Sequence, residues 1–128
     1  MGEITVSRVY DHDPARGKRG KGGKGGKVYL VDRLWPRGVR REDLDLDGWA
    51  KDAAPSTELR RWYDHEPGRW AEFQRRYTAE LDARPDAWRP LAEAAEAGHV
   101  TLLYSSRERE RNNAVVLRDY LLARLREP

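Results

Sequence analysis

Two short runs of the sequence, VYLVD at residues 28–32 and HVTLLYS at residues 99–105, are apolar on both faces of an extended chain. Strands of this kind are typical of parallel sheets, which are covered on both sides. A third run, ITVSRVYD from Ile4, alternates apolar and polar residues as a strand with one exposed face does. The sequence therefore predicts a small, mostly parallel sheet.

The segments between and after these runs have helical patterns. Ser56 after Pro55 is a suitable N-cap, and Pro67 suits the first turn of a helix whose apolar residues recur every three or four positions. Gly98 is a natural C-terminal stop. We expect helices at residues 56–63, 67–81, 86–97 and 114–125. The predicted fold class is α/β, a single compact domain over residues 1–128 with helices flanking the sheet.

Composition supports a folded chain. Leu, Ile, Val and Phe make up only 23 of the 128 residues, a low share that is typical of disordered proteins. Five Trp and six Tyr compensate, because each aromatic side chain buries a large area. The absence of cysteine excludes disulfides and thiolate chemistry. Because no signal peptide or membrane-spanning run is visible, we expect a cytoplasmic protein.

The net charge of +3 is unevenly distributed. Residues 16–27 hold six basic residues and no acid, so the rest of the chain has 19 basic against 22 acidic residues. We expect this Gly/Lys-rich tract to be a flexible loop insertion. Its charges suggest an alternative function, a nucleic-acid-binding accessory protein. That alternative uses Lys18, Arg19, Lys21, Lys24 and Lys27.

The glycines of this tract do not form a nucleotide-binding motif. A dinucleotide loop opens a helix, whereas Lys27 leads directly into a strand, and no Gly-Lys-Ser/Thr of a P-loop follows. A methyltransferase is also disfavoured, because no cofactor-binding glycine turn lies between the first strand and a following helix. His12, His65 and His99 lack the spacing of a zinc site. The sequence therefore predicts no cofactor and no metal.

Polar residues follow two of the predicted strands, where parallel sheets bind ligands. Asp32, Arg33, Trp35 and Arg37 follow the second strand, and two guanidinium groups there could clamp a carboxylate or phosphate. The alternative is a structural network, in which Arg33 pairs with a buried acid and Trp35 lies in the core.

Ser105, Arg107 and Asn112 follow the third strand, at the start of the last helix, where backbone N–H groups can hold an anion. Helix capping and charge pairing are the structural alternative. Ser105 and Arg111 have the Ser-x5-Arg spacing of a phosphatase-like loop, but the thiolate and glycines of such a loop are missing.

A third group lies near the first predicted helix. Ser56 is above all an N-cap, while Lys51 would need burial to act as a base and His65 is a lone loop histidine. Arg60, on the helix, completes the candidate ligand-binding set: Asp32, Arg33, Trp35, Arg37, Arg60, Ser105, Arg107 and Asn112.

Three segments, VDRLWPRG (31–38), KDAAPSTELRRWY (51–63) and VTLLYSSRERERNNAVVL (100–117), resemble the YeaO-like bacterial proteins, a family of unknown function. The resemblance implies a compact α/β fold and a cytoplasmic bacterial protein. More distant relatives carry two cysteines at the positions of Tyr104 and Asn112, and a His-Arg pair at Asn113 and Ala114. Cysteine or redox chemistry is therefore not expected here.

The preferred interpretation is a site for a small anionic metabolite at the carboxyl end of the sheet. Whether the site also catalyses a reaction is left open by the sequence, as is the oligomeric state. Arginines at the strand ends lie in an otherwise acidic body, which favours a focused anion pocket over a broad nucleic-acid surface.

Overall fold

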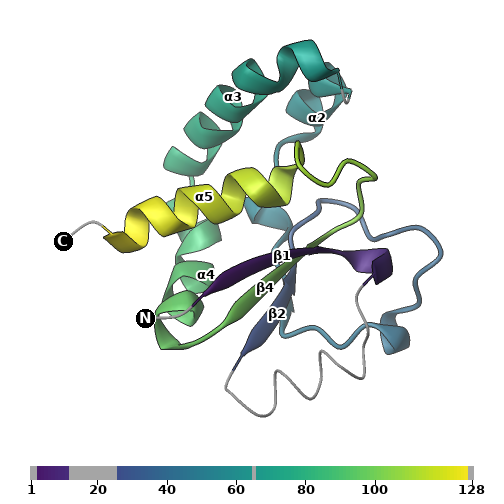
Figure 1. Cartoon of the computed structure of the whole chain (residues 1–128), viewed down its shortest axis with the longest axis vertical. Coiled ribbons are helices and arrows are strands. Elements are labelled where there is room, and N and C mark those ends of the chain that lie inside the picture. Colours follow the sequence, from purple (N-terminus) through teal and green to yellow (C-terminus); the bar gives the residue numbers. More distant parts are fainter. Residues whose placement is uncertain (1–2, 12–25, 65, 127–128) are drawn as a thin grey trace.

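Four parallel strands form one sheet in the order β1-β4-β2-β3. The computed structural model describes residues 3–11, 26–64 and 66–126. The strands are β1 (Ile4–Arg8), β2 (Lys27–Leu30), β3 (Gly48–Trp49) and β4 (Val100–Tyr104). Because β4 pairs with both β1 and β2, the last strand of the chain lies inside the sheet, as Figure 1 shows. The predicted α/β class is confirmed.

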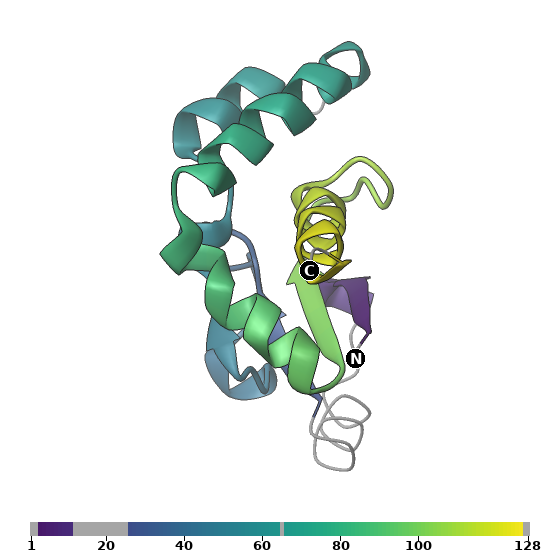
Figure 2. The same ribbon diagram turned by 90° about the vertical axis from the view of Figure 1, so that its left-hand side faces the viewer.

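The helices follow the predicted order. Within the described ranges they are α2 (Thr57–Tyr63), α3 (Trp70–Asp82), α4 (Pro85–Ala97) and α5 (Asn113–Arg126). Single turns of 3-10 helix are η1 (Val9–Asp11), η2 (Arg41–Asp43), η3 (Lys51–Ala53) and η4 (Pro67–Arg69). Figures 1 and 2 both show α2 and α3 together at one end of the molecule, away from the sheet. None of the described helices has the length and apolar character needed to cross a membrane.

The two faces of the sheet belong to different apolar clusters. Leu102 of β4 lies in the cluster that contains the buried residues of all four α-helices, while its neighbour Leu103 belongs to a second, smaller cluster. That second cluster includes Leu44 and, at its margin, Trp35, from the irregular segment between β2 and β3. The alternation explains why residues 28–31 and 102–104 are apolar on both faces of their strands.

Ser56 begins α2 as predicted. Its hydroxyl accepts a hydrogen bond from the backbone N–H of Leu59 at 3.1 Å. The Glu80 carboxylate of α3 accepts from both the backbone N–H (2.8 Å) and the hydroxyl (2.6 Å) of Ser56. Tyr77, also on α3 and fully buried, donates its hydroxyl to the carbonyl of Ala53. These bonds hold α3 against the segment that enters α2.

Several boundaries differ from the sequence prediction. β1 ends at Arg8, because the chain turns into η1 at Val9. Pro67 starts a 3-10 turn, and α3 begins at Trp70. The two-residue strand β3 has no counterpart in the sequence pattern. It pairs with β2 through Gly48 opposite Tyr29, and a Cβ at Gly48 would lie 3.1 Å from the Tyr29 ring.

The Gly/Lys-rich tract predicted as a flexible insertion at residues 16–27 lies outside the described residues, apart from Gly26 and Lys27. Lys18, Arg19, Lys21 and Lys24, which carry the nucleic-acid alternative, are therefore not described, and Lys27 is the exposed first residue of β2.

Candidate functional site

A cavity of about 530 Å³ lies where β2 and β4 end. The segment after β2, helix α2, the loop after β4 and the start of α5 form its walls, so the two polar segments that the sequence singles out share one cavity. Its volume is within the range of small-molecule sites. The lining residues are Tyr10, Asp32, Arg33, Leu34, Trp35, Pro36, Arg37, Pro55, Arg60, Arg61, Tyr63, Asp64, Phe73, Ser105, Ser106, Arg111, Asn112 and Asn113.

Asp32 joins the ends of the two central strands. One of its carboxylate oxygens accepts hydrogen bonds from the backbone N–H (2.9 Å) and the hydroxyl (2.6 Å) of Ser105. The other accepts from the Asn113 side-chain amide at 3.2 Å. Burial raises the pKa of Asp32, although these hydrogen bonds and the positive charge of Arg60 act in the opposite direction. The carboxylate therefore serves the scaffold rather than an external ligand.

The Arg33 guanidinium is also engaged by the protein. Its Nε donates to the carbonyl of Pro55 at 3.1 Å, and a terminal nitrogen donates to the carbonyl of Ala54 at 3.3 Å. Arg33 therefore has a structural role and is not available as an anion clamp. Its partners are backbone carbonyls, and not the buried acid that the sequence suggested. Arg33 still brings positive charge to the cavity wall.

Trp35 is held in the turn that follows. Its indole N–H donates to the carbonyl of Val39 at 2.6 Å, and its ring packs edge-on against Trp49, with centroids 5.4 Å apart. Gly38 completes this turn with a φ of 80°, a conformation that favours glycine. Trp35 therefore shapes the cavity wall while it packs against the smaller apolar cluster.

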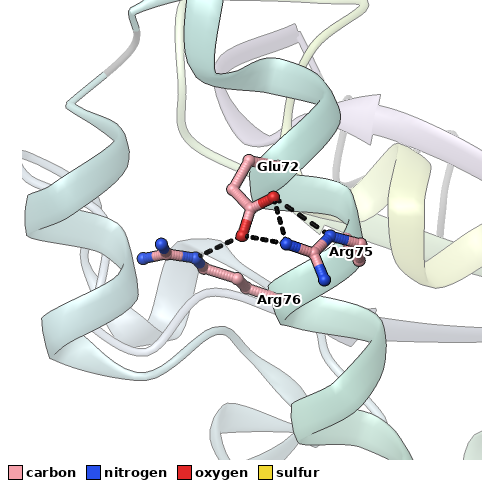
Figure 3. A network of polar contacts seen from close by, with 3 residues as sticks. All are labelled: Glu72, Arg75 and Arg76. Atoms are coloured by element: carbon pink, nitrogen blue, oxygen red, sulfur yellow. Dashed lines mark hydrogen bonds and ion pairs between the residues drawn. The ribbon is translucent and has the colours of Figure 1, made fainter.

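Four other arginines of the cavity make no hydrogen bond or ion pair through their side chains within the described part of the chain: Arg37, Arg60, Arg61 and Arg111. All four are exposed. The arginines of α3 contrast with them, because Arg75 and Arg76 share the carboxylate of Glu72 at 2.5 to 3.0 Å (Figure 3). Five arginines and two aspartates line the cavity, so positively charged residues outnumber negatively charged ones in its wall.

The loop between β4 and α5 is organised by its own side chains. Asn112 is 3% exposed and caps α5, since its side-chain oxygen accepts from the backbone N–H of Val115 at 3.0 Å. The Glu108 carboxylate accepts from the backbone N–H groups of Glu110 (3.1 Å) and Arg111 (3.2 Å). The capping interpretation is thus confirmed. Charge pairing at helical spacing is not formed, because the helix begins only at Asn113.

Of the eight residues proposed from the sequence, Arg107 alone does not line the cavity; it is exposed on the loop. Lys51 is exposed with its ammonium 5.0 Å from the centroid of the Trp49 ring, and so lacks the burial that a catalytic base needs. His65 lies outside the described residues. No cluster of three or more potential metal ligands is present in the described ranges.

Three aromatic residues of the wall, Tyr10, Tyr63 and Phe73, were not predicted from the sequence. Tyr10 follows β1, whose carboxyl end points to the same edge of the sheet, so the rule applied to the other two strands would have found it. Tyr63 and Phe73 come from the apolar faces of α2 and α3, where the pattern of the sequence indicates only core packing.

Comparison with known proteins places this architecture in a family. A family model described as "Inactive DUF488-N3 subclade" matches residues 3–128. The chain is 46% identical over 92 residues to the uncharacterised protein YeaO of Escherichia coli K12, covering 72% of this chain and 80% of that protein. It is 40% identical over 122 residues to the uncharacterised protein Rv3073c of Mycobacterium tuberculosis, covering 94% and 95%. No solved structure matches the chain significantly. With the family model matching almost its whole length, the chain belongs to the YeaO-like DUF488-N3 family, in the subclade described as inactive.

Proposed function

We propose that this protein binds a small anionic molecule in the cavity at the carboxyl ends of β2 and β4. The observation that carries the proposal is the set of four cavity arginines, Arg37, Arg60, Arg61 and Arg111, whose guanidinium groups have no hydrogen-bond or ion-pair partner among the described residues. Guanidinium groups bind phosphate and carboxylate through two parallel hydrogen bonds.

Two further observations support an external anion. The carboxylates nearest the strand ends are already engaged: Asp32 accepts from Ser105 and Asn113, and Glu108 accepts from its own loop. Within the described ranges, neither carboxylate forms a hydrogen bond or ion pair with the side chain of a cavity arginine. An anion that enters the cavity therefore meets guanidinium donors that no carboxylate of the described residues occupies.

Binding without a chemical step is the favoured form of this function. The family description calls the subclade inactive, and the groups at the strand ends are used structurally. The Ser105 hydroxyl donates to Asp32, and the Asn112 side chain caps α5. Both side chains keep the wall rigid, which lowers the entropic cost of binding.

Calorimetry with the full chain tests the proposal. Inorganic phosphate and ribose 5-phosphate are titrated at low ionic strength, and we expect binding that weakens as salt rises. Arg60→Gln should weaken binding about tenfold, the value of one charge-assisted hydrogen bond. The matched control is Arg89→Gln, which removes the same charge from an exposed site on α4.

The two variants distinguish binding in the cavity from a general effect of the protein's net charge on affinity. Both retain the basic tract at residues 16–27, so a loss seen only with Arg60→Gln is assigned to the cavity. The proposal is wrong if neither probe binds the wild type, or if Arg89→Gln weakens binding as much as Arg60→Gln does.

A further inference from the structure

Apolar side chains mark the mouth of the same cavity. Among the described residues, the large hydrophobic side chains that remain exposed are Tyr10 (45%) and Leu34 (62%), and both line the cavity. A single exposed apolar residue is common on protein surfaces. Two of them beside one arginine-lined cavity instead indicate an apolar subsite next to the charged one.

Tyr10 is held in place although its ring is exposed. Its hydroxyl donates to the backbone carbonyl of Arg37 at 2.8 Å, and the Arg8 guanidinium lies over the ring, 4.7 Å from the centroid. Arg8 is anchored in turn through Nε to the carbonyl of Ser106 at 2.9 Å. The ring is therefore a preorganised surface next to the backbone of Arg37, whose side chain has no hydrogen-bond or ion-pair partner among the described residues.

The inner wall of the cavity is aromatic as well. Tyr63 and Phe73 are buried and stacked, with ring centroids 4.4 Å apart and planes inclined by 23°. The Tyr63 hydroxyl donates to the backbone carbonyl of Arg111 at 3.1 Å, which joins this wall to another cationic residue. Aromatic side chains and arginines thus both line the cavity.

We infer that the ligand carries an aromatic ring in addition to its anionic group, with a nucleoside monophosphate as the representative of this class. This inference rests on the proposed function. The phosphate meets Arg37 and Arg60, and the planar base packs against Tyr10 and Leu34. Stacking on an exposed aromatic side chain suits any base, because every base has a π-face.

The test compares adenosine 5′-monophosphate with ribose 5-phosphate, which has the same sugar and phosphate but no base. Calorimetry on the full chain should show that the nucleotide binds at least about fivefold tighter, the smaller end of the range for stacking of one base. If ribose 5-phosphate binds and the nucleotide binds equally or more weakly, this inference is wrong while the proposed function stands. If neither binds, both fail.

Variants at the mouth locate the subsite. Leu34→Ser and Tyr10→Ser should each reduce the preference for the nucleotide over ribose 5-phosphate. Tyr10→Phe is the matched control, because it keeps the ring and loses only the bond to the Arg37 carbonyl; it should keep the preference. Arg60→Gln should weaken both ligands equally. A preference that survives both serine variants would overturn the assignment to Tyr10 and Leu34.

Discussion

Asp32 and Ser105 are 73 residues apart in the sequence and meet at the adjacent ends of β2 and β4, where one carboxylate oxygen accepts from both the backbone N–H and the hydroxyl of Ser105. Asn113 adds a bond to the other oxygen and also donates to the carbonyl of Val31. One carboxyl group therefore fixes two strand ends and the first residue of α5.

The burial of this carboxyl gives stability a definite dependence on pH. The pKa of Asp32 is raised above its ordinary value of 3.8 by burial. The folded protein therefore keeps a proton that the unfolded chain releases, and the free energy of unfolding falls as pH rises from about 3.8 through the raised pKa. Asp32→Asn removes the ionisable group and with it this decrease in the free energy of unfolding. Urea unfolding from acidic to neutral pH should show wild type losing stability relative to the variant as pH rises.

The control for this experiment is Glu93→Gln, which changes an exposed carboxyl group of α4 that makes no hydrogen bond or ion pair among the described residues. Its stability should remain parallel to that of wild type across the same pH range. A constant difference between wild type and Asp32→Asn would show that Asp32 ionises equally easily in the folded and unfolded chain, contrary to this prediction.

Arg33 and Arg37 should respond differently to the same substitution. Arg33 bonds two backbone carbonyls, those of Ala54 and Pro55, and a lysine ammonium does not reproduce this forked geometry. We expect Arg33→Lys to lower the free energy of unfolding by about 1–2 kcal/mol. Arg37→Lys, at an exposed side chain, should change it by less than about 0.5 kcal/mol. Chemical denaturation of both variants measures the difference; equal effects would contradict the structural role of Arg33.

The features that sequence could predict depend on near neighbours along the chain. Ser56 is recognisable as a cap because its acceptor serves Leu59, three residues later. The run at residues 28–32 is recognisable as a covered strand because alternate residues meet different apolar clusters. Both signals depend on residues close together in the sequence, and the structure confirms both.

The features that sequence missed depend on distant partners. Arg33 donates to backbone carbonyls some twenty residues away. Because every residue type has a backbone carbonyl, the sequence gives no sign of these partners. Strand β3 forms because Gly48 fits against the Tyr29 ring, and two residues are too short for a pattern. The position of Arg107 after β4 predicts a place in the cavity wall, but the irregular loop before α5 leaves this residue outside the lining.

Ser56 joins α2 and α3 more tightly than a simple cap would. Its hydroxyl both accepts from the Leu59 N–H and donates to Glu80. Ser56→Ala should therefore lower the free energy of unfolding by about 1–2 kcal/mol, measured by thermal or urea unfolding. Ser56→Thr, which keeps a hydroxyl, should lose less than the alanine variant does. Equal losses for alanine and threonine would assign the effect to packing instead.

Glu108 should limit how tightly the cavity holds an anion. Its carboxylate lies in the loop before α5 and accepts hydrogen bonds from the N–H groups of Glu110 and Arg111. Burial raises the pKa of Tyr63, a residue of the cavity wall, and the charge of Glu108 adds to that effect. Glu108→Gln keeps an oxygen acceptor for the loop and removes the negative charge. At low salt, ribose 5-phosphate should then bind about twofold tighter, an effect on the order of 0.5 kcal/mol for a partly screened charge near the site.

Glu96→Gln provides the comparison for this charge effect. It removes the same charge from the exposed last turn of α4, next to the start of β4 and therefore at the opposite end of that strand from the cavity. Its affinity for ribose 5-phosphate should equal that of wild type. The gain with Glu108→Gln should also shrink as salt is added, because screening weakens the repulsion that the substitution removes. Weaker binding by Glu108→Gln would instead mean that the carboxylate supports the shape of the cavity more than its charge opposes the ligand.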